Sequence, residues 1–553
     1  MEHNDKRFRI PNRDVKLTDF EVAVTHTKAF QRLFYLKQLG LAYLVYPCAT
    51  HTRAGHSIEC LDEAAKLLSS IKIGEQHEEY KHVRMAALLH DIGHIPYSHT
   101  LEDEHEVLQK HDKGERLNIV LDKLKNEVGQ DVRQLIDKAT PILSAISSSD
   151  ENEHDWRSDL VGNTVCADLL AYITTDAAWT GIEKRPGYYR IYDYFIKTIE
   201  ERENLPNRDR LCIRLTKGGL RTDIVSAILD LLDMRYALTE RVIVHHAKAI
   251  ASAMLARAAR LAGLQENASL LDMGDEMFIA YLTNLANSNE DKEAADGAKM
   301  LIDHLQCRRL YKRIFKVQRH AMEEWDRTKQ RNDGDTFSMR WRKSEEIERL
   351  LSQIEERHDL PRGSLVLWCP EAKSSMKLVR VKVVWEQSGG WHKPVELRSN
   401  DVQKQFPGIH DRVDNIEQQY LDLWTFWIGI HPDYLKMVPG VIEDLSSGLD
   451  IECDPVFLET YAKDRLPEYA ESAKLYDSVK NTLRKNIVPE VQRRLLDLAA
   501  RPGTKVDEAI ITDTIQNVSA GISAGGKKAK KSEKTGQLGL SGIDESVKEE
   551  PSK

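Results

Sequence analysis

Cysteine is scarce in this sequence and never closely paired. Seven cysteines occur among 553 residues, and none stands in a Cys-x-x-Cys arrangement. Small secreted scaffolds and zinc knuckles depend on dense or closely spaced cysteines. We therefore expect reduced thiols, not a disulfide framework or a cysteine-bound zinc ion.

Long apolar runs are absent as well. No segment approaches the roughly 20 apolar residues of a membrane-spanning helix, and residues 1–5 lack the basic start of a signal peptide. We expect a cytoplasmic protein. The net charge of -9 argues against binding duplex nucleic acid over the whole surface. This net charge is still compatible with a local basic channel that binds a polyanionic nucleotide.

Helical periodicity dominates residues 10–345, so we predict a mainly α fold with a helical catalytic region over residues 1–345. An amphipathic segment follows, with apolar residues at helical spacing. These residues are Ile347, Leu350, Leu351 and Ile354.

The pattern changes after residue 363. Residues 364–369, 377–385 and 395–397 are rich in β-branched residues and predict strands. Together with helices expected near 415–428 and 477–500, they predict a smaller α+β C-terminal lobe over residues 346–500. Residues 501–553 are rich in Gly, Ser, Lys and Glu and predict a disordered tail.

The most informative feature of the chain is the pair His90 and Asp91. Val83, Ala86 and Ala87 share one helical stripe with His90, so the imidazole emerges where the helix otherwise buries carbon. Gly93 and Pro96 then mark the end of this helix. An imidazole and a carboxylate held rigidly at a helix end favour a metal site.

Two other segments offer matching ligands. His56 lies at the start of a second predicted helix, which continues through residues 58–68 at helical spacing. Residues 165–176 are apolar enough for a core helix, yet Asp168, Tyr172 and Asp176 recur at a spacing of four on one face. Buried acids need partners. Imidazole and carboxylate ligands suit Mg, Mn, Fe or Zn, and do not tell these ions apart.

An order of His, then His-Asp, then a distant Asp is the ligand order of the HD superfamily. Several blocks carry a closer likeness in the same order, and the chain resembles the HD-domain deoxynucleoside triphosphate triphosphohydrolases over about residues 10 to 320. The last two blocks are similar to the family's long helix and to a later helix. The blocks are residues 30–33, 36–47, 53–57, 90–99, 168–181, 230–246 and 309–315.

This resemblance implies a metal-dependent enzyme with a helical HD-domain core. His56, His90, Asp91 and Asp168 match the family's metal ligands. The implied reaction is attack of water on the α-phosphorus, which releases intact triphosphate and leaves a deoxynucleoside.

The resemblance also implies roles for the surrounding residues. His94, His99 and His111 match phosphate-binding and catalytic imidazoles, and Glu102 matches the carboxylate that orients His111. Arg53 matches a residue that holds phosphate oxygens. The implied substrate-binding residues near the sugar and its 3′-hydroxyl are Gln38, Leu39, Tyr172 and Asp176.

Family members are often tetramers or hexamers, with nucleotides at separate allosteric sites. The resemblance therefore implies a homo-oligomer that is activated by nucleotides. It also implies a biological role in deoxynucleotide homeostasis or in antiviral defence against phage.

Alternatives stay open at this point. The same four ligands serve HD phosphodiesterases and nucleases, and a nucleotide sensor with little turnover is a third hypothesis.

Glu102 lies in the acidic run of residues 102–106, and this run is equally compatible with a solvated surface. A second His-Asp pair, His154 and Asp155, lies in a polar stretch, so we interpret it as a loop. His245 and His246 point about 100 degrees apart on a helix and predict a packing role.

Overall fold

The computed structural model describes residues 6–10, 13–111, 115–148, 150–182, 188–202, 205–328, 336–371, 381–387, 390–454 and 457. The chain divides into two compact units, Met1–Tyr461 and Ala462–Lys553, and every described residue belongs to the first. The domain boundaries expected after residues 345 and 500 stay predictions. The helix expected at 477–500 and the tail expected at 501–553 lie outside the described residues.

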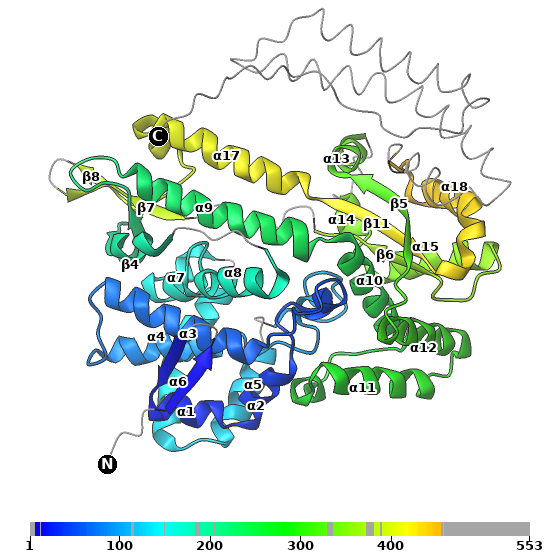
Figure 1. The fold of residues 1–553 in the computed structure, drawn as a ribbon, viewed down its shortest axis with the longest axis horizontal. Coiled ribbons are helices and arrows are strands. Elements are labelled where there is room, and N and C mark those ends of the chain that lie inside the picture. The colour runs from blue at the N-terminus through cyan, green and yellow to red at the C-terminus, as the bar shows by residue number, and fades with distance from the viewer. Residues whose placement is uncertain are drawn as a thin grey trace, which may run out of the picture. The chain divides into compact units, whose positions relative to one another are not determined.

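Helices make up most of the first unit, which confirms the mainly α fold class (Figure 1). The longer helices of its first part are α1 (Asp19–Thr25), α2 (Lys28–Gln31), α3 (Arg53–Ser70), α4 (Glu78–Leu89), α5 (Glu115–Asn126), α6 (Gln130–Ser147), α7 (Trp156–Gly162), α8 (Ala167–Thr180), α9 (Thr222–Leu238), α10 (His246–Leu261), α11 (Asp275–Ser288) and α12 (Lys292–Gln306). Those of its second part are α13 (Arg319–Thr328), α14 (Phe337–Arg340), α15 (Ser344–Arg357), α16 (Asn400–Gln405), α17 (Pro407–Asp422) and α18 (Val438–Leu449).

Three predicted helices, α3, α4 and α8, form the centre of the first part. α3 packs against both α4 and α8, because each helix buries a stripe of apolar residues. Ile58 and Leu61 of α3 and Val83 of α4 are almost completely inaccessible to solvent. α8 ends at Gly181, whose φ of 72° is the left-handed conformation that glycine adopts without strain. The packed helices give the predicted ligands a rigid base.

The long helix expected over residues 230–246 is interrupted. α9 ends at Leu238, a π-helical turn follows at Thr239–Ile243, and α10 begins at His246. Single π-helical turns inside helices often mark functional sites. The interruption exposes part of Ile243 at the edge of a cavity described below.

Two small sheets involve the first part of the chain. β1 (Lys6–Ile10) and β2 (Arg13–Leu17) form an antiparallel hairpin. β3 (Phe195–Glu200) and β4 (Arg208–Arg214) form another, and β4 pairs in parallel with β7 (Lys382–Val384), which also pairs with β10 (Val395–Glu396). The strands β2, β3 and β4 were not predicted, because they lie within residues 10–345, where helical periodicity dominates. Strands of the expected C-terminal lobe complete a sheet that begins within the expected helical region.

A three-stranded sheet has the order β5 (Lys312–Gln318), β11 (Thr425–Ile430) and β6 (Leu365–Trp368). The helix expected at 309–315 is wrong, because Ile314 and Phe315 are buried in β5 and pair with the central strand. The helix expected at 415–428 ends early, since α17 stops at Asp422 and the apolar residues after it form β11. A two-stranded ladder, β8 (Glu386–Gln387) with β9 (Gly390–Trp391), completes the described strands.

The amphipathic segment after residue 345 is confirmed as α15, with its four predicted apolar residues buried. None of the helices in the described part of the chain combines the length and apolar character needed to cross a bilayer.

Candidate active site

Arg53 and His56 enter the site from the first turn of α3. The Thr52 hydroxyl caps this turn by accepting a hydrogen bond from the Gly55 amide at 3.3 Å. Arg53 and His56 are three residues apart and therefore lie on one face of the helix. Their exposed fractions are 1% and 3%, so both polar side chains are held inside the fold.

His90 and Asp91 follow the last turn of α4, where His90 is the C-cap residue. His90 Nδ1 lies 2.8 Å from the carbonyl oxygen of Ala87 and donates to it, because a carbonyl only accepts. In the neutral ring the lone pair is therefore on Nε2, where it can bind a cation. Asp168 reaches the same place from the first turn of α8.

Four predicted metal ligands converge. The Nε2 atoms of His56 and His90 are 3.2 Å apart, and Asp168 Oδ1 lies 3.1 Å from the first and 3.7 Å from the second. Asp91 Oδ1 is 3.4 Å from His90 Nε2. Two ligand atoms about 2.1 Å from one ion lie roughly 3.0 to 3.4 Å apart at octahedral or tetrahedral angles. The donor set and its spacing fit a divalent metal ion.

The electrostatics of this cluster also suit a cation. Burial acts to raise the pKa of Asp168, but hydrogen bonds with His56 and His90 hold it well below its ordinary value. Burial likewise acts to raise the pKa of Asp91. The charges of His90 and Arg53 have the larger, opposite effect, so the pKa of Asp91 lies well below its ordinary value. Both carboxylates are therefore ionised near neutral pH.

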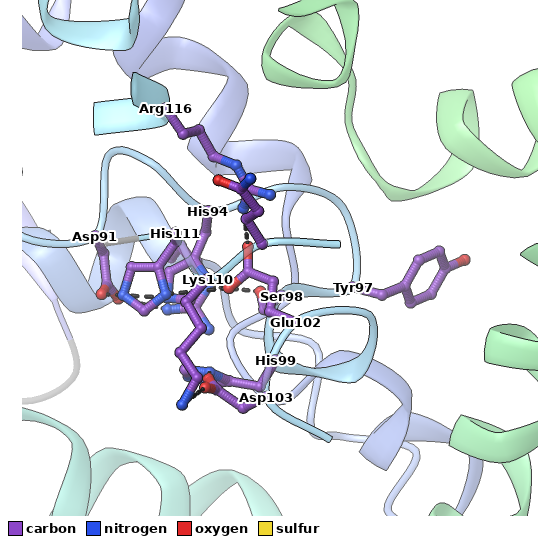
Figure 2. A network of polar contacts seen from close by, with 12 residues as sticks. Asp91, His94, Tyr97, Ser98, His99, Glu102, Asp103, Lys110, His111 and Arg116 are labelled. Atoms are coloured by element: carbon purple, nitrogen blue, oxygen red, sulfur yellow. Dashed lines mark hydrogen bonds and ion pairs between the residues drawn. The ribbon is translucent and has the colours of Figure 1, made fainter. Parts of the chain in front are cut away.

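A second cluster adjoins the first one (Figure 2). Glu102 has an exposed fraction of 0%, and its Oε2 atom lies 3.0 Å from His111 Nδ1 and 3.3 Å from His94 Nδ1. The rings of His94 and His111 are stacked, with centroids 3.5 Å apart. Glu102 is thus a buried anchor of the two imidazoles, not part of a solvated acidic surface.

Arg116 holds the other oxygen of this anchor. Its Nη1 atom lies 2.5 Å from Glu102 Oε1, and its Nη2 atom lies 2.8 Å from Glu266 Oε2. Nothing in the local sequence marks Arg116 as part of the site. Arg116 lies in the first turn of α5, a separate element that brings its guanidinium to Glu102.

The second cluster also has the composition of a metal site, since His94, His99, Glu102 and His111 place ligand atoms within 4.8 Å of one another. Two positively charged guanidinium groups lie close to this cluster and would repel a second cation there. Arg116 pairs with Glu102, and Arg53 donates to Ser98 Oγ at 2.6 Å and forms an ion pair with Asp91. Burial, and then the charge of Arg53, lower the pKa of His94 to about 3. The positive charge of the Arg53 and Arg116 guanidinium groups favours an anion over a second metal ion at this place.

Arg32 stabilises the loop of residues 92–94, which lies between the two clusters. The motifs assigned no role to this residue. Its guanidinium donates to the carbonyl oxygens of Ile92 at 2.5 Å and His94 at 2.6 Å. Gly93 lies between these two residues, and a Cβ atom there would stand 2.4 Å from the carbonyl oxygen of His111. Glycine therefore permits the close approach that brings His111 to the His-Asp turn.

His99 is the least enclosed of the predicted imidazoles. Its side chain is 48% exposed, and its Nδ1 atom lies 2.7 Å from Asp103 Oδ2. Lys110 pairs with the same carboxylate at 2.8 Å. His99 therefore lies at the solvent-facing side of the cluster.

A cavity of about 220 Å³ opens beside the second cluster. Gln38, Leu39 and His99 line it together with apolar residues of the π-helical turn and with Trp368. Lys248 lies 5.6 Å from the centroid of the Trp368 ring. The cavity thus joins three of the predicted substrate-binding residues around a mostly apolar space.

Tyr172 and Asp176 lie on α8, and neither is among the described residues that line that cavity. The Tyr172 ring centroid is 6.4 Å from that of His56, and burial raises the pKa of its hydroxyl. Asp176 pairs with His51, a residue that the motif analysis did not single out, at 2.8 Å. The predicted sugar-binding set is therefore divided between two places.

The two histidine pairs set aside from the sequence lie in structural positions. Asp155 caps α7 by accepting from the amides of Arg157 and Ser158, and His154 contacts the Ser148 carbonyl at 3.1 Å. His245 caps α10, and its ring stacks on His246 with centroids 4.4 Å apart.

Comparisons with known proteins agree with this geometry. The HD domain family model matches residues 53–141, and a model described as the HD associated region matches residues 215–388. An uncharacterized protein of Methanocaldococcus jannaschii is 28% identical over 309 residues, which is 55% of this chain and 58% of that protein.

A protein of Dictyostelium discoideum named as a deoxynucleoside triphosphate triphosphohydrolase SAMHD1 homolog is 26% identical over 326 residues, 55% of this chain and 58% of its own length. The chain thus spans 58% of the length of each of these two curated relatives. The crystal structure of a phosphohydrolase from Bacteroides thetaiotaomicron has a TM-score of 0.52 at 18% identity, covering 77% of this chain and 100% of that one, and shows the shared fold. The chain is therefore similar to HD-domain proteins over residues 53–141, and it shares its fold with a known phosphohydrolase structure.

Proposed function

We propose that this chain is a metal-dependent phosphohydrolase that converts deoxynucleoside triphosphates to deoxynucleosides and inorganic triphosphate. One observation carries the proposal: Asp91 joins a cation site to an anion site. Its Oδ1 atom lies 3.4 Å from His90 Nε2 on one side and 3.4 Å from His94 Nε2 on the other. A phosphate group next to a metal ion needs this arrangement.

On the cation side, His56, His90, Asp91 and Asp168 would hold the ion. When bound, a divalent ion supplies positive charge that polarises a phosphoryl group and lowers the pKa of water. The residues themselves contribute orientation. The bond from His90 to the Ala87 carbonyl fixes the ring so that Nε2 faces the cluster.

On the anion side, Arg53, His94 and His99 would bind phosphate oxygens. Arg53 is fixed by Ser98 and Asp91 before any substrate arrives, so binding does not have to order its side chain. The ring nitrogens of the buried His94 lie 3.3 Å from Glu102 Oε2 and 3.4 Å from Asp91 Oδ1, and neither contact has the geometry of a hydrogen bond. An incoming phosphate oxygen would compete with one of these carboxylates for a ring N–H.

His111 is the proposed proton donor. Its Nδ1–H donates to the buried Glu102 carboxylate, which stabilises the protonated ring, and the proton of the other ring nitrogen is the one proposed to pass to the leaving group. During hydrolysis the water oxygen bonds to the α-phosphorus and the water releases a proton to the solvent. The bond from phosphorus to O5′ breaks, O5′ takes the proton from His111, and His111 regains a proton from the solvent. The released triphosphate keeps the water oxygen.

The substrate class rests on the family resemblance, on the name of the Dictyostelium relative, and on the cavity beside the second cluster. Gln38, Leu39, Tyr172 and Asp176 are the proposed residues around the nucleoside. A homo-oligomer and activation by nucleotides belong to the same proposal, and so does a role in deoxynucleotide homeostasis or phage defence.

The test incubates the purified full-length chain with Mn²⁺ or Mg²⁺ and each deoxynucleoside triphosphate, singly and mixed, and identifies the products. Deoxynucleoside with inorganic triphosphate, lost in Asp91→Ala, supports the proposal. Turnover in mixtures alone would show nucleotide activation, and the oligomeric state is measured on the same samples by light scattering. Cleavage of cyclic nucleotides or single-stranded DNA instead would favour a phosphodiesterase or nuclease. Tight binding without any product would favour a sensor.

A further inference from the structure

His51 forms a buried pair with Asp176 that no motif accounted for. Its Nε2 atom lies 2.8 Å from Asp176 Oδ1, and each side chain is only 8% exposed. His51 comes from the segment just before α3, whereas Asp176 lies in the middle of α8. The pair therefore joins two segments that carry proposed substrate-binding residues.

The direction of this hydrogen bond follows from the partners. An ionised carboxylate only accepts, so His51 Nε2–H is the donor and the neutral ring has its lone pair on Nδ1. That Nδ1 atom is buried and has no hydrogen-bond partner among the described residues. The His51 ring stacks on Trp179 at 5.6 Å with an interplanar angle of 17°. Stacking fixes the plane of the ring, and with it the direction of the N–H bond.

The backbone of His51 holds a second proposed substrate-binding residue. The carbonyl oxygen of His51 accepts from the Gln38 amide at 2.9 Å, and Lys37 and Thr52 form a β-bridge beside it. Gln38 Oε1 is buried without a partner in the described part of the chain. His51 thus fixes Gln38 through its main chain and Asp176 through its side chain.

Two acceptors beside this pair are positions for a ligand donor. One is Gln38 Oε1, which is buried and has no hydrogen-bond partner among the described residues. The other is Asp176 Oδ2, which the hydrogen bond between His51 and Asp176 Oδ1 does not engage. A ligand hydroxyl is a donor that can satisfy an acceptor of this kind. A carboxylate held at one oxygen presents the other in a fixed direction.

We propose that His51 is a positioning residue that aims Asp176 at the 3′-hydroxyl of the sugar and thereby sets the preference for nucleotides that carry this hydroxyl. The inference rests on the proposed function, since it takes the substrate-binding role of Asp176 from it. It adds a residue to which no role was assigned, and a physical reason for the orientation of the carboxylate.

The test compares two substitutions of matched size. His51→Phe keeps a flat ring for Trp179 but has no N–H donor, whereas His51→Gln has an amide N–H that can still donate to Asp176. For each variant, kcat and KM are measured with the four deoxynucleoside triphosphates and their 2′,3′-dideoxy counterparts. Bound metal is measured on every sample.

We expect the wild-type chain to prefer the 3′-hydroxyl substrates in kcat/KM. In His51→Phe this preference should fall roughly 10-fold, mainly through KM, with metal content unchanged. His51→Gln should recover most of the preference. An equal loss for both substrate series in His51→Phe would mean a structural role and overturn the proposal. The same result in His51→Gln as in His51→Phe would also overturn it, because the donor would then not matter.

A binding measurement separates this inference from the proposed function. Calorimetry with deoxyadenosine and 2′,3′-dideoxyadenosine, and with the other three pairs, needs no turnover. If the wild type hydrolyses nothing but binds the 3′-hydroxyl form more tightly, and His51→Phe loses that difference, the proposed reaction fails and the role of His51 stands. No preference for the 3′-hydroxyl in either assay of the wild type overturns the role of His51.

Discussion

Replacing Glu102 by glutamine should remove most turnover while leaving the metal ion bound. Glu102 is fully buried, lies 3.0 Å from His111 and 2.5 Å from Arg116, and is not one of the four predicted metal ligands. An amide can satisfy Arg116 with its oxygen only by turning its NH₂ group toward His111 Nδ1. His111 would then lose the acceptor that stabilises its protonated ring.

The size of the effect follows from these contacts. Loss of general acid catalysis lowers turnover by roughly 10² to 10⁴-fold. Stability should fall less, by about 1 to 3 kcal/mol, because Arg116 keeps its second ion pair with Glu266 at 2.8 Å. Steady-state kinetics, chemical denaturation and metal analysis on one preparation measure all three quantities.

Glu266→Gln is the matched control. It removes one carboxylate charge from the same guanidinium, but the Glu266 side chain is 38% exposed, so the loss should stay below about 1 kcal/mol with turnover nearly intact. Turnover of Glu102→Gln within about threefold of the wild type would refute the assignment of Glu102 and His111. Equal inactivation of both variants would show that the charge of Arg116, and not the orientation of His111, matters.

Other consequences of the site can be measured on the same protein. His111→Ala should retain the metal but lose most turnover, whereas Asp91→Ala should lose both, as metal analysis and kinetics will show; normal turnover in His111→Ala would remove that residue from the mechanism. Arg32→Met should destabilise the fold by about 3 kcal/mol or more in chemical denaturation, because two buried carbonyls lose their donor; an unchanged midpoint would contradict this. Treatment with a chelator should abolish turnover and lower the melting temperature, and addition of Mn²⁺ should restore both; a chelated protein of unchanged stability would argue against a bound metal ion.

The four proposed metal ligands were predictable from the sequence, because local sequence patterns mark the helices that carry them. His56, His90 and Asp91 stand at helix ends that capping residues and apolar stripes mark. Asp168 was found because an acid on an apolar helix requires a partner. The structure brings these residues together as the motif order implied.

The contacts that orient the site were harder to predict. Arg116, Arg32 and His51 act through partners that are 14 to 125 residues away in the sequence. A lone arginine or histidine has the same local pattern whether it is solvated or buried. Tertiary packing alone decides which of them meets a carboxylate.

The strands β5 and β11 were not predicted, for a related reason. β5 and β11 are short apolar segments, and their length and composition fit a buried helix end as well as a strand. Their identity depends on pairing between Lys312–Gln318 and Thr425–Ile430, which no local window contains. The same holds for β4, whose parallel pairing with β7 joins residues far apart in the chain. The strand β7 itself lies within the strand predicted over residues 377–385.

Hydrolysis in water enriched in ¹⁸O tests the central claim most directly. The full-length chain is incubated with Mn²⁺ and a deoxynucleoside triphosphate, and both products are analysed by mass spectrometry. The account predicts one ¹⁸O atom in inorganic triphosphate and none in the deoxynucleoside, because water attacks the α-phosphorus and O5′ stays with the sugar. Deoxynucleoside monophosphate with pyrophosphate, or label in the 5′-hydroxyl of the nucleoside, would contradict it.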